Sequence, residues 1–120
     1  MARLSVDFYS TSLMRTTTLD VILPTDCPGD AMGFDYMRRQ DPASWDRTPM
    51  PAEKPPLKAL FLLHGISGNH TDFMSETRIR TFAEERGLAV IMPSGYNAFY
   101  LDHPETHNYY GRYVGLELVE

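Results

Sequence analysis

LKALFLLHGISGNHTDF, residues 57–73, carries the strongest structural signal in this sequence. It opens with an apolar run in which Lys58 is the only charge, and it stops abruptly at a histidine, a glycine and a loop of small residues. About seven apolar residues bounded by Pro56 and Gly65 suit a strand better than a helix. We therefore predict a buried strand, covered on both faces by helices, that leads into a functional loop.

The residues after this loop have the period of an amphipathic helix. Ile79, Phe82 and Ala83 fall at positions i, i+3 and i+4, while the charged residues face the other way. This pattern predicts a surface helix over residues 75–86. Gly87 is placed to end that helix as a left-handed cap.

A second short apolar run follows the helix. Residues 88–92, LAVIM, end in Pro-Ser-Gly and predict another buried strand. Two strands joined by one helix form a βαβ unit, whose right-handed crossover places both carboxyl ends at the same edge of a parallel sheet. Sites in α/β folds form at that edge, so we expect the chemistry there.

An antiparallel hairpin is predicted before this unit. Apolar and polar residues alternate over residues 2–9, and residues 15–23 are rich in β-branched side chains until Pro24 ends the second strand. Residues 25–56 read as a proline-rich loop, either an insertion that covers one edge of the sheet or a loop that binds substrate. After a polar aromatic loop over residues 96–108, a helix is expected from Tyr109, with Tyr113, Leu116 and Val119 on the same stripe. Residues 1–120 are thus expected to be part of one domain.

The composition fits a packed globular domain and excludes some partners. Of the 120 residues, 42% are apolar and 22% are charged, which is ordinary for a domain with a core. The net charge is -5 and the basic residues are scattered, so nucleic acid is not expected as a partner. The sequence has no membrane-length apolar window and no secretory signal, and it has a single cysteine, so we expect a cytoplasmic protein.

Three stretches together resemble a known enzyme family. LFLLHGISGNHTDF, ERGLAVIMPSGYNAFYLD and the tyrosine-rich segment ending in ELVE resemble the N-terminal part of the tributyrin esterase and esterase D type of α/β-hydrolase. The resemblance implies an incomplete α/β-hydrolase fold with a mostly parallel sheet. It also implies a serine carboxylesterase for short-chain acyl esters, with no cofactor, no metal and a possible homo-oligomeric state. Relatives of this type hydrolyse S-formylglutathione or release acetyl and feruloyl groups.

The resemblance assigns one element of ester hydrolysis to this chain. Such an enzyme needs a nucleophile, a base, an acid to orient the base, and amide donors for the oxyanion. In α/β-hydrolases one donor comes from the loop after the third strand, and the resemblance implies the backbone N–H of Ile66. Gly65 and Gly68 would let this loop turn sharply and approach a ligand without a Cβ in the way, or they serve only the conformation of a strand-to-helix turn. The candidate substrate contacts in this loop and after the next strand are Gly65, Ser67, Asn69, Ser94, Gly95, Asn97 and Tyr100.

Two residues of the loop invite a catalytic assignment that the sequence does not support. The triad of this fold runs in the order serine, acid, histidine, so His64 comes too early to be the base and is expected to brace the loop. Ser67 lacks the G-x-S-x-G context of a nucleophile, because Asn69 stands where the last glycine is required. Phe73 is expected to brace the loop or to border the acyl pocket.

A metal site is also not expected. His103 and His107 are four residues apart, with Asp102 and Glu105 nearby, a spacing that could bind zinc on a helix. Pro104 argues against a helix at that point.

Two interpretations follow from the absence of a G-x-S-x-G nucleophile in these 120 residues. In the first, the sequence is the N-terminal part of a longer esterase. In the second, it is a non-catalytic fragment or a binding module. An unpaired apolar edge at residues 60–63 would expose the second to aggregation, which favours the first. Coding sequence downstream of Glu120 would separate the two.

Overall fold

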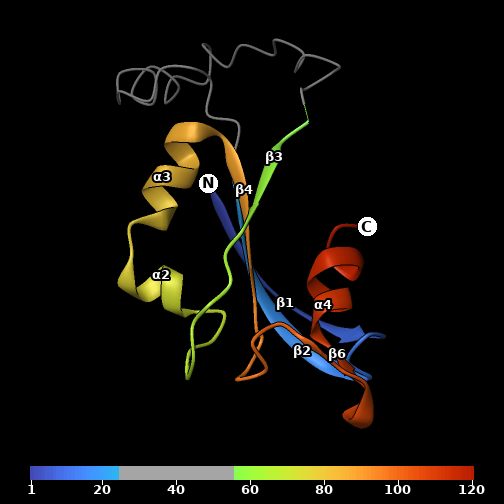
Figure 1. Ribbon diagram of the computed structural model, residues 1–120. Helices are drawn as coiled ribbons and strands as arrows, with labels where there is room; N and C mark the ends of the chain where they lie inside the picture. The colour runs from blue at the N-terminus through green and yellow to red at the C-terminus, as the bar shows by residue number, and fades with distance from the viewer. Residues whose placement is uncertain (25–55) are drawn as a thin grey trace, which may run out of the picture. The chain divides into compact units, whose positions relative to one another are not determined.

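The computed structural model describes residues 1–24 and 56–120 (Figure 1). The chain divides into two compact units, and the unit described here consists of Met1–Pro24 and Leu57–Glu120. The predicted proline-rich insertion at residues 25–56 lies, apart from Pro56, outside the described residues.

Four strands form one mixed sheet in the order β1-β2-β4-β3. β1 (Ala2–Ser10) and β2 (Arg15–Leu23) pair as an antiparallel hairpin. β4 (Leu88–Pro93) lies antiparallel to β2 and parallel to β3 (Lys58–Phe61). The predicted hairpin and the predicted parallel pair are both confirmed. The alternation in β1 does not bury its apolar side, because Leu4 and Val6 are 42% and 38% exposed.

Two helices connect β3 to β4, where the sequence predicts one. α2 (Asp72–Glu76) and α3 (Ile79–Arg86) are separated at Thr77, whose hydroxyl donates to the Phe73 carbonyl and accepts the Ile79 N–H at 3.2 Å. This hydroxyl ends one helix and starts the next, which the apolar period does not reveal. Gly87 has φ 60° and closes α3 as a left-handed cap, as predicted.

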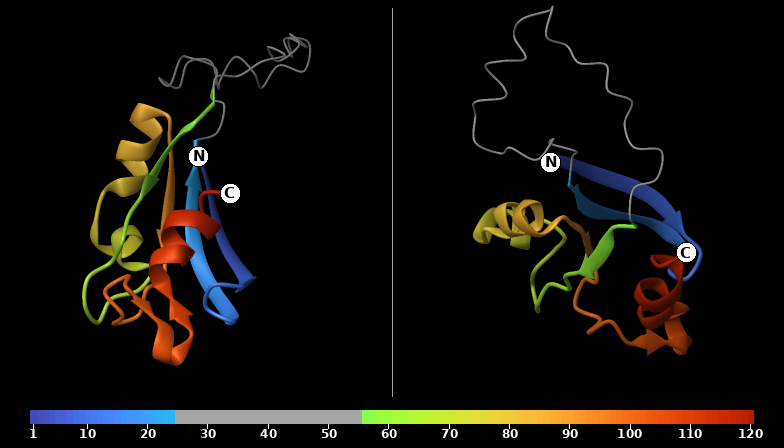
Figure 2. Two further views of the ribbon diagram at one scale, coloured as in Figure 1. Left: turned by 45° about the vertical axis from the view of Figure 1, so that its right-hand side comes forward. Right: turned by 90° about the horizontal axis from the view of Figure 1, so that it is seen from above.

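Helices cover both sides of the sheet (Figures 1 and 2). α2 and α3 lie on one side, where the buried side chains Ile22, Ala83, Val90 and Met92 form a core cluster. α4 lies on the other side, where a second cluster contains Leu13, Tyr110 and Tyr113. Buried residues therefore concentrate around the two central strands, β2 and β4. Within residues 1–24 and 56–120, no helix combines the length and apolar character needed to cross a membrane.

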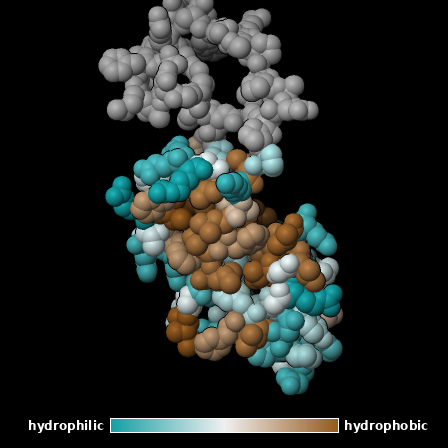
Figure 3. Space-filling view, turned by 45° about the horizontal axis from the view of Figure 1, so that its top comes forward, coloured by the Kyte–Doolittle hydropathy of each residue, from teal (hydrophilic) through white to brown (hydrophobic). Residues whose placement is uncertain are grey.

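The prediction that β3 is buried is wrong for the described residues. Residues 58–60 are exposed, and apolar Leu57, Leu60 and Leu63 have exposed fractions of 53%, 37% and 40%. The reason is position, because β3 is the edge strand and, in the described part of the chain, pairs only with β4. Figure 3 shows apolar residues gathered on one face of the molecule. The predicted unpaired edge is therefore present.

The last twenty residues differ from the predicted loop and helix. The predicted loop contains β5 (Asp102–His103), a 3-10 turn (Pro104–Thr106) and β6 (Asn108–Tyr109). α4 (Tyr110–Arg112) then continues into a π-helical turn, Tyr113–Glu117. A π-helical turn is wider than an α-helical one, so the residues of the predicted stripe no longer lie on one face of the helix. Tyr110 and Tyr113 are buried, whereas Leu116 and Val119 are exposed.

Glu117 ties this C-terminal helix to the turn between β1 and β2. Its carboxylate accepts hydrogen bonds from the hydroxyl of Ser10 at 2.6 Å and from the N–H and hydroxyl of Thr11 at 2.6 and 3.0 Å. The Ser12 N–H adds a fourth at 3.3 Å. Burial raises the pKa of Glu117, but these hydrogen bonds to the charged form outweigh it and lower the pKa to about 2.

Glu117→Gln is expected to reduce the free energy of unfolding by about 1 to 3 kcal/mol at pH 7, because hydrogen bonds to a charged acceptor are lost. The folded pKa of about 2 lies below the ordinary value of 4.5, so the stabilisation is present above pH 4.5 and is lost as the pH falls towards 2. Urea unfolding of both proteins at pH 7 and pH 3 should show the difference shrinking. Glu105→Gln, at an exposed position, is the matched control, and an equal loss there would contradict the assignment.

Candidate functional site

The candidate site lies where the parallel strands β3 and β4 end. We call residues 62–71 the β3 loop and residues 94–101 the β4 loop. Three hydrogen bonds join the two loops, and each connects residues at least 24 positions apart. The three pairs are His64 with Gly95, Ser67 with Asn97, and His70 with Ser94. The predicted βαβ unit thus brings both loops to one edge of the sheet.

His64 is buried, and its two ring nitrogens have different partners. The Gly95 N–H donates to Nε2 at 2.8 Å, and a backbone N–H can only donate, so Nε2 must carry a lone pair. The proton of the neutral ring is then assigned to Nδ1, which lies 2.7 Å from the Gly65 carbonyl oxygen and donates to it. Both nitrogens are used to hold loops, which agrees with the predicted bracing role.

The Gly65 carbonyl also accepts the Gly68 N–H at 3.2 Å, which closes a four-residue turn. Ser67, the third residue of the turn, has φ 63°, the sign that a type II turn requires there. In a planar trans peptide the C=O and the N–H point in opposite directions. Because the Gly65 carbonyl is held towards His64 and Gly68, the N–H of Ile66 is directed away from them. Within the described residues this N–H has no acceptor, and the Ile66 side chain is 72% exposed.

The two glycines of this turn differ in the space that a Cβ would find. A Cβ at position 68 would overlap the Asp72 carboxylate and would lie 3.3 Å from the Gly65 carbonyl oxygen, so the Asp72 side chain, which accepts the Asn69 N–H, would have to move. A Cβ at position 65 would meet nothing within 4 Å among the described residues, and Gly65 has no positive φ. The prediction that Gly65 is needed for a sharp turn is therefore not supported, and the space beside it is open.

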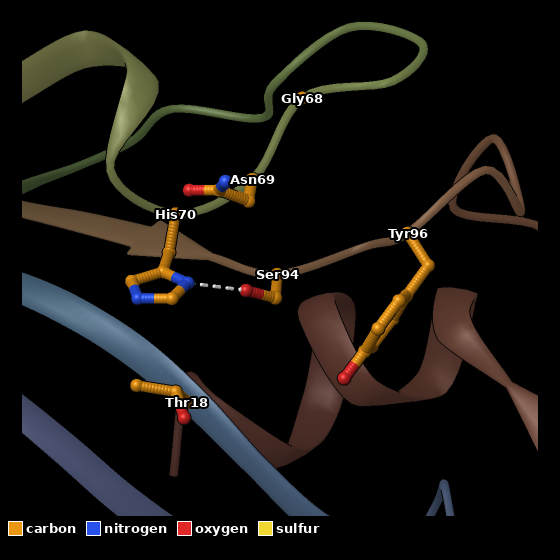
Figure 4. Close-up of a pocket in the computed structure, with 6 residues that line it drawn as sticks. All are labelled: Thr18, Gly68, Asn69, His70, Ser94 and Tyr96. Carbon is orange, nitrogen blue, oxygen red and sulfur yellow. Dashed lines mark hydrogen bonds between the residues drawn. The ribbon is translucent and has the colours of Figure 1, made fainter.

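A pocket of about 190 Å³ lies between the loops and β2 (Figure 4). Of the predicted substrate contacts, Asn69 and Ser94 line it. The predicted contacts that are not among its lining residues are Gly65, Ser67, Gly95, Asn97 and Tyr100, and the predicted donor Ile66 is not among them either. The full lining consists of Thr18, Gly68, Asn69, His70, Ser94 and Tyr96.

His70 and Ser94 form a pair in this pocket that the sequence did not predict. His70 Nδ1 lies 2.7 Å from Ser94 Oγ, and Figure 4 shows the two side chains pointing towards one another. In a catalytic triad, however, Nε2 faces the serine and Nδ1 faces the acid. The orientation of His70 is the reverse, and within the described residues no carboxylate bonds to its Nε2. We therefore interpret this pair as a link between the loops. The only sequence signal for it is the position of both residues after parallel strands.

Asn69 also holds the turn that precedes α2. Its side-chain oxygen accepts the N–H and the hydroxyl of Thr71, both at 2.7 Å, while its own N–H donates to the Asp72 carboxylate at 3.2 Å. This reciprocal arrangement resembles a capping box. Phe73 packs against the core cluster of Ile22 and Val90, which agrees with a bracing role.

The β4 loop has an unusual backbone. Tyr96, Phe99 and Tyr100 all have positive φ, at 48°, 53° and 55°, which is uncommon for bulky residues. The Tyr100 ring meets the His64 ring edge-on with centroids 5.7 Å apart, and burial raises the pKa of its hydroxyl. The Arg15 guanidinium lies 4.8 Å from the centre of the Tyr96 ring. These contacts hold the strained conformation, and such backbone strain is concentrated at functional sites.

His103 and His107, the two histidines four residues apart, lie outside this site. His103 is in β5, and His107 follows the 3-10 turn with φ 53°, so the two do not share a helix. Asp102 accepts the N–H groups of Gly111 and Arg112, which start α4. Among residues 1–24 and 56–120, no three His, Cys, Asp or Glu residues are grouped so as to hold a metal ion.

Comparison with known proteins identifies esterases and serine hydrolases. The acetyl esterase of Caldicellulosiruptor saccharolyticus is 36% identical over 120 residues, which is 100% of this chain and 39% of that protein. No protein-family model matches the chain.

Solved structures agree with this relationship. FphF, a fluorophosphonate-binding serine hydrolase of Staphylococcus aureus, matches with a TM-score of 0.69 and 30% identity over 98% of this chain and 39% of its own. The S-formylglutathione hydrolase FrmB of the same species matches with a TM-score of 0.63 and 28% identity, over 99% of this chain and 41% of its own. The chain spans about two fifths of the length of these relatives. It has the fold of part of an α/β-hydrolase and is similar in sequence to esterases and serine hydrolases.

Proposed function

We propose that this chain is part of a serine carboxylesterase and supplies one donor of its oxyanion hole, the backbone N–H of Ile66. The observation that carries the proposal is the direction of the Gly65–Ile66 peptide. His64 and Gly68 hold its carbonyl, so its N–H is left free of any partner in the described part of the chain. A fixed N–H aimed at the position of developing negative charge is what an oxyanion hole requires.

The substrate we propose is a small ester with a short acyl chain, as for tributyrin esterases. The similarity to an acetyl esterase supports a short acyl group, and the similarity to FrmB supports S-formylglutathione as an alternative substrate. Feruloyl esters are a further alternative. Gly65, Ser67, Asn69 and Ser94 are proposed to contact the substrate, Gly65 through the open space beside it and the last two through the pocket. We propose that the enzyme acts in the cytoplasm and needs no cofactor.

The test is hydrolysis of p-nitrophenyl esters by the full-length protein. We expect turnover that falls with acyl length from acetate to octanoate and that is blocked by a fluorophosphonate. The 120-residue chain alone is expected to show no hydrolysis above background, because none of its residues is assigned as the nucleophile. Fluorophosphonate-sensitive turnover by the short chain would contradict this assignment. Absence of turnover by the full-length protein on esters and S-formylglutathione would favour a binding module instead.

A further inference from the structure

Asn97 lies in the β4 loop, yet its side chain holds the β3 loop. Its Oδ1 accepts the N–H of Ser67 at 2.7 Å across 30 residues of sequence. Among the described residues the Asn97 side chain makes no other hydrogen bond. It is exposed and belongs to neither core cluster. The bond therefore acts on the β3 loop more than on the stability of the domain.

Ser67 needs an external partner to keep its conformation. Its φ of 63° is left-handed, which costs a residue other than glycine about 1 to 2 kcal/mol. Glycine is the residue that a type II turn prefers at this third position, and Ser67 stands in its place. A hydrogen bond from Asn97 to the Ser67 N–H fixes the Ile66–Ser67 peptide and so offsets the intrinsic preference against the turn.

The two peptides on either side of Ile66 are held from different elements. His64 and Gly68 fix the Gly65–Ile66 peptide through the Gly65 carbonyl. Asn97 fixes the following peptide. A rotation of the first peptide would redirect the N–H of Ile66 itself. If Ser67 left its left-handed conformation, Gly68 would shift and its hydrogen bond to the Gly65 carbonyl would be strained, so the peptide that carries the Ile66 N–H would lose one of its two restraints.

We propose that Asn97 is a positioning residue for the oxyanion donor, acting through Ser67. This inference rests on the function proposed above. Asn97 touches neither the substrate nor the reacting atoms in this role. It keeps the turn at residues 65–68 in the conformation in which the Gly68 N–H holds the Gly65 carbonyl, and the peptide that carries the Ile66 N–H stays fixed.

The test substitutes Asn97 in the full-length protein, once with Ser67 present and once in the Ser67→Gly variant. Asn97→Ala is expected to lower kcat for p-nitrophenyl acetate about tenfold, a fraction of the loss expected when a donor is removed outright, with KM changed less than about twofold. In the presence of Ser67→Gly the same substitution is expected to cost less than about threefold, because glycine adopts positive φ without help. Thermal unfolding should stay near that of the parent protein in each case, since Asn97 is exposed.

The comparison of Asn97→Ala in the two backgrounds separates a positioning role of Asn97 from a role within its own loop. If Asn97 served only its own loop, a change at residue 67 would not alter the effect of Asn97→Ala, so an equal loss of kcat in both backgrounds overturns the inference. An unchanged kcat for Asn97→Ala in the Ser67 protein also overturns it. Ile66→Pro distinguishes this result from failure of the proposed function. If Ile66→Pro is inactive and Asn97→Ala is fully active, only the role of Asn97 is wrong.

Discussion

Ile66→Pro in the full-length protein is expected to lower kcat for p-nitrophenyl acetate by about 100- to 1,000-fold, the loss measured when one oxyanion donor is removed. Proline lacks the backbone N–H, so the substitution deletes the proposed donor itself. It also suits the position, because residue 66 is the second residue of the turn closed by Gly65 and Gly68, where proline is favoured. The fold of the loop should therefore survive. Steady-state kinetics would measure the loss of kcat, and thermal unfolding would show whether the fold is retained.

The matched control is Ile66→Ala, which shortens the same side chain and keeps the N–H. We expect a loss below about tenfold, the scale of a trimmed apolar contact. Two results would count against the donor assignment. One is wild-type turnover by Ile66→Pro in a protein that unfolds at the normal temperature. The other is an equal loss in both variants, which would place the effect in the side chain.

Gly95→Ala is expected to lower the free energy of unfolding by about 3 kcal/mol, the upper part of the usual range for overpacking. A Cβ at this buried position would overlap the Tyr100 ring. The ring cannot move away freely, because it packs against His64 and its backbone is already left-handed. The Gly95 N–H also donates to His64 Nε2, so a shift of the backbone would loosen the β3 loop and reduce activity. Urea unfolding and ester hydrolysis measure the two effects.

Gly115→Ala is the control for this substitution. A Cβ at Gly115 meets nothing within 4 Å among the described residues, and alanine favours a helix, so stability should be unchanged or slightly higher. A double-mutant cycle with Tyr100→Ala tests the cause. Once the ring is removed, Gly95→Ala should cost much less, and additive effects would show that the clash with Tyr100 is not responsible.

The sequence predicted those elements whose signals are local. Alternation and short apolar runs predict β1, β2 and β4 directly, and the glycine after a helical period predicts the cap at Gly87, because a positive φ selects glycine. The break at Thr77 was missed because it depends on one hydroxyl. The helical phase after Tyr113 was missed because a π-helical turn leaves no mark in the apolar period.

The sequence predicted that the loops after β3 and β4 lie at one edge of the sheet, but it did not predict how they are connected. The resemblance of HGISGN to an oxyanion loop indicated residues 64–69, and the bracing role of His64 followed from the order of the triad. The pairs His70 with Ser94 and Ser67 with Asn97 could not be predicted. Each depends on the register of β3 against β4, which fixes the loops only after the sheet has formed. The exposure of β3 also depends on its place at the sheet edge.

The carboxylate of Glu117 has a consequence for the order of folding. It joins residues separated by 105 to 107 positions, so its closure is one of the most non-local events in this chain. The β1–β2 hairpin can pair early from contacts close in sequence, whereas its turn is secured only after the C-terminal helix has been synthesised and docked. During synthesis, protection of the Thr11 amide from hydrogen exchange should therefore lag behind protection of the hairpin ladder.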